Sequence, residues 1–483
     1  MSVKRDTVYN LCGSIAPMFV SLVTVPIYLH LIGNARYGVL AIVWLFLGYF
    51  GIFDPGITRA AAYHIARLHG KDREKERESV FWTALLVNSV FGLAGGLALY
   101  LAARPIFMHF FKMSGAIRAE VLTSLPWMAA SIPVAVTAGV LVGALQAREW
   151  FGFTNSVNVG NAAMVQLAPL AVAYWHGPEL SWLIPTVLIA RTLGIIPGAV
   201  ALKHALPLGV GGRFDRSRLK DLFTYGGWVT ITNVISPLLS SMDRLLIGSL
   251  LSAEAVAFYT VPFNLVSRAS ILPGALSSSL FPKLSRGSTE ESSRLASDSV
   301  AALAAVMTPV IVIGMAALPV FLRLWVGRSF AEQAASVGIV LLMGIWVNGL
   351  AYIPFGHLQA TGRPDLVAKF HAYEFLPFIG LLWFGLHSFG LLGAAWAWTI
   401  RVAFDAALLF MAGGTISRWH RLIPGGLIVV AAAFVSPTSV LSARTGIELG
   451  LLVLAIAWSW NLSPAVRSLV RGWAVRARIR ATV

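Results

Sequence analysis

Charged side chains within long apolar stretches are the residues of this sequence most able to do chemistry. They comprise five arginines and four carboxylates: Arg59, Arg191, Arg244, Arg268 and Arg401, with Asp54, Asp243, Glu374 and Asp405. A charge in the bilayer core costs roughly 3 kcal/mol, so such side chains usually face a cavity or a partner. Arginine binds phosphate with a planar, permanently charged fork. The arginines therefore predict an anion-binding site, and the carboxylates are candidates for binding a coupling H+ or Na+.

Arg191 and Arg401 are the leading candidates for the anion site. They lie 210 residues apart, close to the spacing of an internal repeat described below. Equivalent positions in two repeats predict a pair of guanidinium groups facing each other across a cleft near the middle of the membrane. The alternative is local pairing, because Arg401 and Asp405 are four residues apart and share one helix face.

The other charges have open interpretations. Asp243 and Arg244 are adjacent, so they point in different directions from a helix, and one of them is expected to face the cavity. Asp243 is a candidate for ion coupling, and Glu374 a weaker one. Pro55 and Gly56 follow Asp54 and predict a local break in the helix. Arg59 lies beyond that break and contacts either substrate or the membrane surface.

The elements that must position these charges are membrane-spanning helices. The 483 residues are 57% hydrophobic and only 12% charged, with a mean hydropathy of +0.75. A soluble protein would carry about twice that share of charge. The sequence predicts an all-α polytopic membrane protein with about 14 spans of about 20 residues each. We place them at 7–31, 36–64, 80–103, 119–146, 152–175, 180–202, 223–249, 255–281, 298–322, 332–358, 369–387, 390–412, 424–441 and 447–465.

The chain contains an internal repeat. Gly143-Ala-Leu-Gln-Ala147 matches Gly356-His-Leu-Gln-Ala360 at an offset of 213, and Pro55-Gly56 matches Pro273-Gly274 at 218. Six spans separate the copies, which predicts two parallel six-helix lobes related by an axis along the membrane normal. The predicted organisation is an N-lobe at 1–202, a cytoplasmic linker at 203–222, a C-lobe at 223–412, and two further helices with a basic tail at 413–483.

Charge sets the predicted orientation. With the N-terminus in the cytoplasm, 25 of the 37 Lys and Arg residues fall on the cytoplasmic side and seven on the other. This bias places both termini in the cytoplasm of a multi-pass protein. The net charge of +16 then indicates basic loops at an anionic cytoplasmic leaflet, and no nucleic-acid partner is expected.

Enzyme and cofactor signatures are absent from the sequence. There is no P-loop, and the histidines and the single cysteine lack metal-binding spacing. We therefore expect no catalytic residues, no cofactor, no metal site and no use of ATP. The chain is predicted to be a transporter and not an enzyme.

Three elements give a family resemblance. Asp54-Pro-Gly-Ile57, Leu145-Gln-Ala147 and Leu358-Gln-Ala-Thr-Gly-Arg363, together with the twelve-plus-two layout, resemble the Wzx-type polysaccharide flippases. The resemblance covers essentially the whole chain. It implies translocation of an undecaprenyl-diphosphate-linked oligosaccharide from the cytoplasmic to the periplasmic leaflet of a bacterial inner membrane by alternating access, for O-antigen or exopolysaccharide synthesis. A polysaccharide polymerase of the same pathway is an implied partner. Pro55 departs from the family, which often has Leu there.

Two alternatives remain at this point. A cation-coupled multidrug exporter of the same superfamily would have a similar layout, but it should place carboxylates in its cavity. The five arginines against four carboxylates favour an anionic substrate. A membrane polymerase or ligase would be expected to carry a large periplasmic catalytic loop, whereas the longest loop on that side, 104–118, is short.

Overall fold

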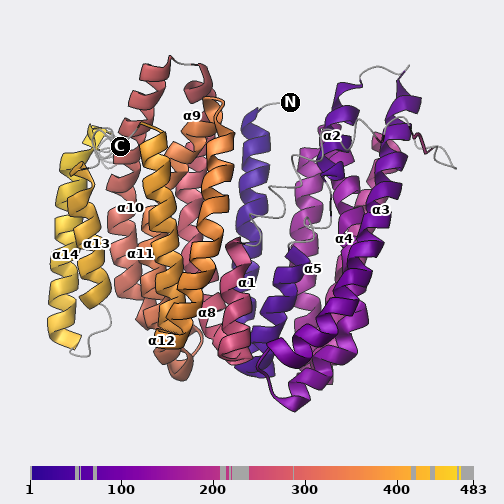
Figure 1. Cartoon of the computed structure of the whole chain (residues 1–483), viewed down its shortest axis with the longest axis horizontal. Helices are drawn as coiled ribbons and strands as arrows, with labels where there is room; N and C mark the ends of the chain where they lie inside the picture. The colour runs from indigo at the N-terminus through magenta and orange to yellow at the C-terminus, as the bar shows by residue number, and fades with distance from the viewer. Residues whose placement is uncertain are drawn as a thin grey trace, which may run out of the picture. The chain divides into compact units, whose positions relative to one another are not determined.

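The computed structural model describes most of the chain as helices (Figure 1). Its described residues are 3–48, 54, 56–68, 73–206, 214–216, 219, 239–286, 288–414, 420–435, 441–464 and 467–468, and none of them lies in a β-strand. The chain forms two compact units, Met1–Ala257 and Phe258–Val483. The predicted linker 203–222 and the tail beyond residue 468 lie largely outside the described residues, so the predicted lobe boundaries stay a prediction.

Unit 1 contains the first helices of the chain. The elements are α1 (Val3–Gly48), α2 (Ile57–Arg67), α3 (Glu74–Pro105) with a π-helical extension (Ile106–Phe110), α4 (Gly115–Ala147), α5 (Phe151–His176) and α6 (Leu180–Ala205). Residues 239–250 form a further helix. A core of fully buried apolar side chains joins α2, α3, α4 and α6, among them Ile57, Phe81, Leu145 and Leu202.

Unit 2 contains the remaining helices. The elements are η3 (Ser267–Ser270), α9 (Ile271–Arg286), α10 (Thr289–Trp325), α11 (Arg328–Ala360), α12 (Pro364–Ala412), α13 (Ile423–Val435) and α14 (Leu441–Leu462), and α8 (Ala253–Val266) crosses the boundary between the units. Ser288 begins α10 with a capping box, since its hydroxyl accepts from the Glu291 N–H and its own N–H donates to the Glu291 carboxylate.

The 46-residue α1 is a hairpin of two helices. Gly33 has left-handed φ/ψ of 78° and 164°, which interrupts the helix. The rings of Tyr28 and Trp44 lie 5.6 Å apart, although a straight helix would separate residues sixteen positions apart by about 24 Å. The chain therefore reverses at Gly33, in the gap between the predicted spans 7–31 and 36–64.

The 49-residue α12 reverses in the same way. Gly390 has φ/ψ of 58° and −137°, and the predicted spans 369–387 and 390–412 meet there. The backbones of Gly385 and Gly393 touch, because a Cβ on Gly385 would lie 2.6 Å from the Gly393 carbonyl oxygen. Small residues at both positions let the two arms pack closely beside the turn.

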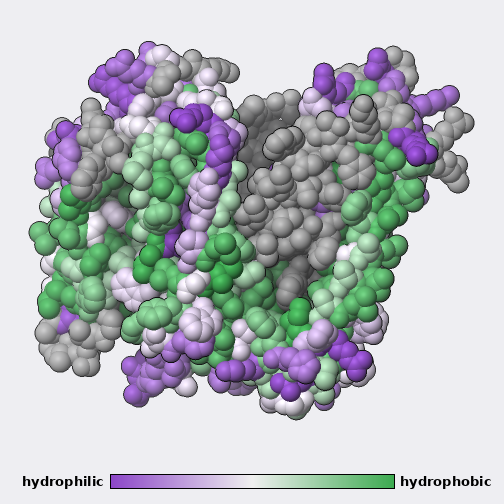
Figure 2. Space-filling model, viewed as in Figure 1, coloured by the Kyte–Doolittle hydropathy of each residue, from purple (hydrophilic) through white to green (hydrophobic). Residues whose placement is uncertain are grey.

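Ten described segments are long and apolar enough to cross a membrane. Two of these segments contain the hairpins at Gly33 and Gly390, so each of these two segments consists of two antiparallel helical arms. Hydrophobic residues cover the middle of the helices, and hydrophilic residues gather at the helix ends (Figure 2). The all-helical membrane fold is confirmed, while the total of 14 spans stays a prediction.

The two Pro-Gly elements have different local structures. Gly56 has φ 72° and caps the start of α2, so the predicted span 36–64 is interrupted there, as the sequence suggests. In unit 2 the break comes earlier, as the 3-10 turn Ser267–Ser270, and Gly274 lies within α9. A 3-10 turn within a spanning segment often marks a hinge.

The glycines of the sequence repeat make equivalent contacts in the two units. A Cβ on Gly143 of α4 would lie 3.3 Å from the Thr58 side chain of α2, and a Cβ on Gly356 of α11 would lie 2.6 Å from the Ser277 hydroxyl of α9. Thr58 and Ser277 lie 219 residues apart, close to the repeat offset. The α2–α4 pair of unit 1 and the α9–α11 pair of unit 2 thus each pack through a glycine at an equivalent position of the repeat.

Candidate functional site

An ionisable cluster lies between the two arms of α12. The Arg401 guanidinium is 3.4 Å from a Glu374 carboxylate oxygen. His371 Nε2 lies 4.0 Å from both Glu374 Oε1 and Asp405 Oδ1. Arg401 also lies over the Phe378 ring, with 5.2 Å between its Cζ and the ring centroid. The cluster brings together three predicted residues and adds His371.

The hairpin explains this arrangement. Because the chain reverses at Gly390, residues of the first arm face residues of the second at similar distances from the turn. His371 and Glu374 lie one helical turn apart on the first arm, and Arg401 and Asp405 lie one turn apart on the second. The alternative drawn from the sequence paired Arg401 with Asp405 along one helix, whereas the structure pairs it with Glu374 across the hairpin.

The cluster contains buried polar atoms without hydrogen-bond partners. They are Glu374 Oε2, Asp405 Oδ1 and Arg401 Nε, and Glu374 is only 2% exposed. Such atoms are costly unless something satisfies them. One ligand atom each from His371, Glu374 and Asp405 lies within 4.8 Å of the others. Oxygen-rich ligands of this kind could hold a proton or a hard cation such as Na+.

Arg191 lies on a hairpin of different chemistry in unit 1. Gly177, with φ 109°, joins α5 to α6, and Arg191 is half-buried near the middle of α6. Neither α5 nor α6 contains an Asp or Glu. One turn beyond Arg191, Asn161 of α5 packs against Gly194 of α6 so closely that a Cβ on Gly194 would overlap the amide. The two arms of this hairpin therefore place no carboxylate beside the charge of Arg191.

Asp243 and Arg244 are both buried in the helix 239–250, at 1% and 5% exposure. The Asp243 carboxylate accepts from the backbone N–H of Arg244 at 2.8 Å, and Arg244 Nη1 donates to the Ser240 carbonyl at 3.0 Å. The predicted divergence of the two side chains agrees with these separate backbone partners.

The remaining predicted residues have diverse surroundings. Arg268 lies in the 3-10 turn and is half-buried, Arg59 is exposed on α2, and Asp54 is buried. The Asp54 carboxylate accepts from the Thr58 N–H at 3.3 Å, so it caps the start of α2. This contact gives Asp54 a structural role beside the predicted ion coupling.

The predicted residues divide between the units. Arg59, Arg191, Arg244, Asp54 and Asp243 lie in unit 1, and the other four lie in unit 2. The pairing of Arg191 with Arg401 across a cleft therefore stays a prediction.

Sequence reasoning missed His371 as a member of the cluster. Folding the sequence back at Gly390 would have found it, because that reversal brings 371 to within about one helical turn of 405.

Comparisons with known proteins identify the family. The model of the family described as "Polysaccharide biosynthesis protein" matches residues 3–288. The chain belongs to this polysaccharide biosynthesis family. A Shigella flexneri relative named "Putative O-antigen transporter" is 30% identical over 410 residues, which cover 85% of this chain and 97% of that protein. The family and this relative confirm the predicted resemblance and the expectation of a transporter and not an enzyme.

Solved structures show the same fold. The lipid II flippase MurJ, in an inward closed conformation, superposes with a TM-score of 0.64 and 13% identity, covering 95% of this chain and all of that chain. An inward-facing multidrug resistance MATE family transporter also gives 0.64, with 15% identity and coverage of 88% and 96%. This chain therefore shares its fold with a lipid II flippase and with a multidrug transporter.

Proposed function

We propose that this chain moves a lipid-linked oligosaccharide from one leaflet of a bacterial inner membrane to the other. The carrier lipid is undecaprenyl diphosphate, and the glycan is a unit of O-antigen or exopolysaccharide. The observation that carries the proposal is the 30% identity to the Shigella flexneri protein named "Putative O-antigen transporter" over 97% of that protein. Similarity over nearly the whole length favours the same kind of cargo.

The charges support an anionic cargo. A diphosphate needs cationic partners inside the membrane, and Arg191 and Arg268 are half-buried arginines within apolar segments. Guanidinium groups donate bidentate hydrogen bonds to phosphate oxygens. We assign Arg191 as the principal phosphate ligand, with Arg401, Arg268, Arg244 and Arg59 as further contacts along the path.

The carboxylates support a coupling ion. Glu374 and Asp405 leave one buried oxygen each without a hydrogen bond, and His371 lies 4.0 Å from both. We assign this cluster the binding of H+ or Na+, whose entry would drive the cycle. Asp54 and Asp243 are secondary candidates, because each carboxylate already accepts a backbone N–H.

The remaining parts of the proposal concern organisation. Two lobes of six helices alternate between inward-open and outward-open states, both termini lie in the cytoplasm, and a polysaccharide polymerase receives the translocated unit. The charge bias of 25 to seven Lys and Arg residues supports the orientation.

A complementation experiment tests the proposal. The chain is expressed in a bacterium that lacks its own O-antigen flippase but makes the lipid-linked unit, and surface polysaccharide is measured. We expect the full chain to restore it and Arg191→Ala to lose it at unchanged protein level. Arg328→Ala is the matched control, because that arginine is 73% exposed and pairs only with its helix neighbour Glu332 among the described residues.

The same cells separate the flippase from the exporter. A multidrug exporter would raise resistance to cationic dyes and leave the surface polysaccharide absent. Raised drug resistance without restored polysaccharide would overturn the proposal.

A further inference from the structure

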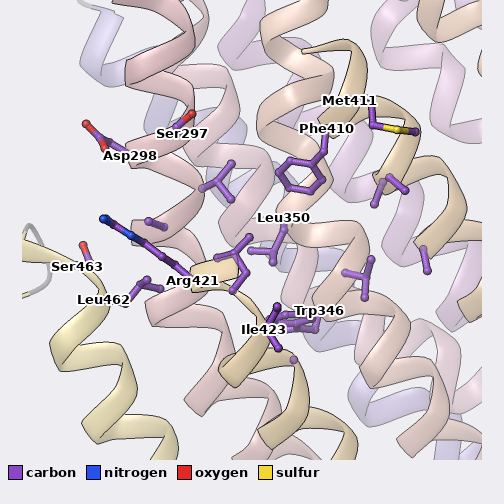
Figure 3. Close-up of a pocket in the computed structure, with 18 of the residues that line it drawn as sticks. Ser297, Asp298, Trp346, Leu350, Phe410, Met411, Arg421, Ile423, Leu462 and Ser463 are labelled. Atoms are coloured by element: carbon purple, nitrogen blue, oxygen red, sulfur yellow. The ribbon is translucent and has the colours of Figure 1, made fainter. Parts of the chain in front are cut away.

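A cavity of about 700 Å³ lies in unit 2 between α10, α11, α12, α13 and α14 (Figure 3). Cavities of ~300–1,000 Å³ are typical of ligand sites. Its inner wall is apolar and includes Trp346, Leu350, Phe410 and Ile423. An apolar space of this size in a membrane protein is suited to a hydrocarbon chain.

Small residues create the space. α12 presents Ala403, Ala406 and Ala407, and α13 presents Gly426. The opposite wall is held in place, because Trp346 Nε1 donates to the Thr308 hydroxyl at 2.9 Å. The cavity is thus built from a fixed aromatic wall facing short side chains.

The rim of the cavity is polar and lies at one boundary of the apolar region. Ser297, Asp298, Arg421 and Ser463 gather at one edge, away from Trp346 and Phe410 (Figure 3). α10 is polar up to Ser299 and apolar from Val300 onward, while Arg421 precedes α13 and Ser463 follows α14. All three segments therefore place the rim where the membrane surface begins.

Arg421 gives the rim its anion-binding group. Its side chain is exposed, and it makes no hydrogen bond or ion pair with the described part of the chain. Asp298 on the same rim repels anions, so an anion would approach the cavity from the Arg421 side. A guanidinium at the membrane surface beside an apolar cavity matches a phosphate attached to a hydrocarbon chain.

We infer that this cavity binds one hydrocarbon chain of a lipid whose phosphate contacts Arg421. The lipid is either a polyprenyl phosphate or a membrane phospholipid, which share this chemistry. The site is separate from the ionisable cluster: at 100° per residue, Ala403, Ala406 and Phe410 lie on the side of α12 opposite Arg401 and Asp405. A lipid in the cavity would press on the helix that carries the cluster.

Thiol protection in the purified full chain tests this inference without any transport readout. Cys12, the only cysteine, is changed to Ser, and Ala407→Cys places a thiol on the exposed, cavity-lining side of α12. The rate of its reaction with a hydrophobic maleimide is measured in detergent with farnesyl phosphate, farnesol or phosphatidylglycerol. We expect farnesyl phosphate to slow the reaction and to bind about tenfold more tightly than farnesol, because of the charged contact to Arg421.

Two variants make the test specific. Arg421→Ala should remove the difference between farnesyl phosphate and farnesol. Ala98→Cys, an exposed alanine on α3 of unit 1, should be labelled at the same rate with or without lipid. Protection by farnesyl phosphate alone would assign the chain to an isoprenyl carrier, and equal protection by phosphatidylglycerol would assign a phospholipid.

A thiol introduced by Ala407→Cys that stays unprotected with both phosphate lipids would overturn the inference, as would equal protection of the thiols at 98 and 407. A failure here leaves the proposed glycan transport standing, since surface polysaccharide is measured separately. A failure of complementation likewise leaves the lipid-binding measurement intact.

Discussion

The hairpin that carries Arg191 and the hairpin that carries Arg401 have the same construction but different chemistry. Each turns at a glycine, Gly177 or Gly390. These glycines lie 213 residues apart, which is also the offset between the matching segments that begin at Gly143 and Gly356. In unit 2 the middle of the hairpin contains four ionisable side chains, with Glu374 opposite Arg401. In unit 1 a close contact between the two arms joins Asn161 to Gly194.

This difference gives the two arginines, which the sequence presents as equivalent, different acidic neighbours. Arg401 has a carboxylate at 3.4 Å, so its positive charge is balanced locally. Arg191 has no acidic residue on either helix of its hairpin. Two hairpins of the same construction can thus surround an arginine with different residues, and this difference supports the separate roles that we propose for the two hairpins.

The largest effect is expected from Arg401→Ala. Removal of the guanidinium leaves Glu374 and Asp405 as neighbouring buried carboxylates, which should lower the free energy of unfolding by about 3 kcal/mol. Thermal unfolding of the full chain in detergent measures the loss. Glu374→Gln in the same chain should restore most of the stability, and an equally unstable double variant would show that Arg401 is not held by Glu374.

Arg191→Ala should affect transport more than stability. Loss of a charged hydrogen bond to phosphate weakens the contact by about 100-fold at most, so glycan export should fall steeply while the melting temperature changes little. Arg191→Lys should recover part of the export because the charge is kept. A variant that exports normally would remove Arg191 from the substrate path and with it the functional contrast between the hairpins.

Two glycine substitutions compare the packing of the hairpins. Gly385→Ala forces a Cβ against the Gly393 backbone, and Gly194→Ala forces one against the Asn161 side chain. Overpacking of this kind costs about 1–3 kcal/mol. Asn161→Ala should relieve the Gly194→Ala defect, whereas no side-chain change should relieve Gly385→Ala. The melting temperatures of the three single variants and of the double variant, measured in detergent, show whether Asn161→Ala relieves the Gly194→Ala defect.

The smallest predicted effect is on ion dependence. Glu374→Gln with Asp405→Asn removes both negative charges from the cluster. The affinity for the ion that drives export should therefore fall by about tenfold, which shifts the Na+ or pH dependence of export. Export into vesicles at varied Na+ and pH measures it. An unchanged ion response would place the coupling site elsewhere, with Asp243 as the next candidate.

Much of the fold could be predicted because hydropathy alone defines spanning helices. The reversals in α1 and α12 fall at Gly33 and Gly390, where predicted spans meet. The glycine of each repeat also marked a close helix contact, at Gly143 and Gly356. These features depend on local composition, which a single sequence displays directly.

The site was only partly predictable because it depends on contacts between distant residues. Intramembrane charge identified Glu374, Arg401 and Asp405, but helical periodicity along one segment offered only Asp405 as a possible partner of Arg401. The contact to Glu374 spans 27 residues and follows from the reversal at Gly390. Likewise, capping of α2 by Asp54 depends on the left-handed Gly56 beside it.

The reversals at Gly33 and Gly390 are too short to form loops. Each turn is made by one glycine with the helix resuming at once, so the two arms meet with almost no connecting polypeptide outside the apolar region. An externally added protease would find little to cleave at either point, and an epitope tag inserted there would separate arms that pack at the turn. Antibodies and tags intended to report on this protein should be directed to other connections.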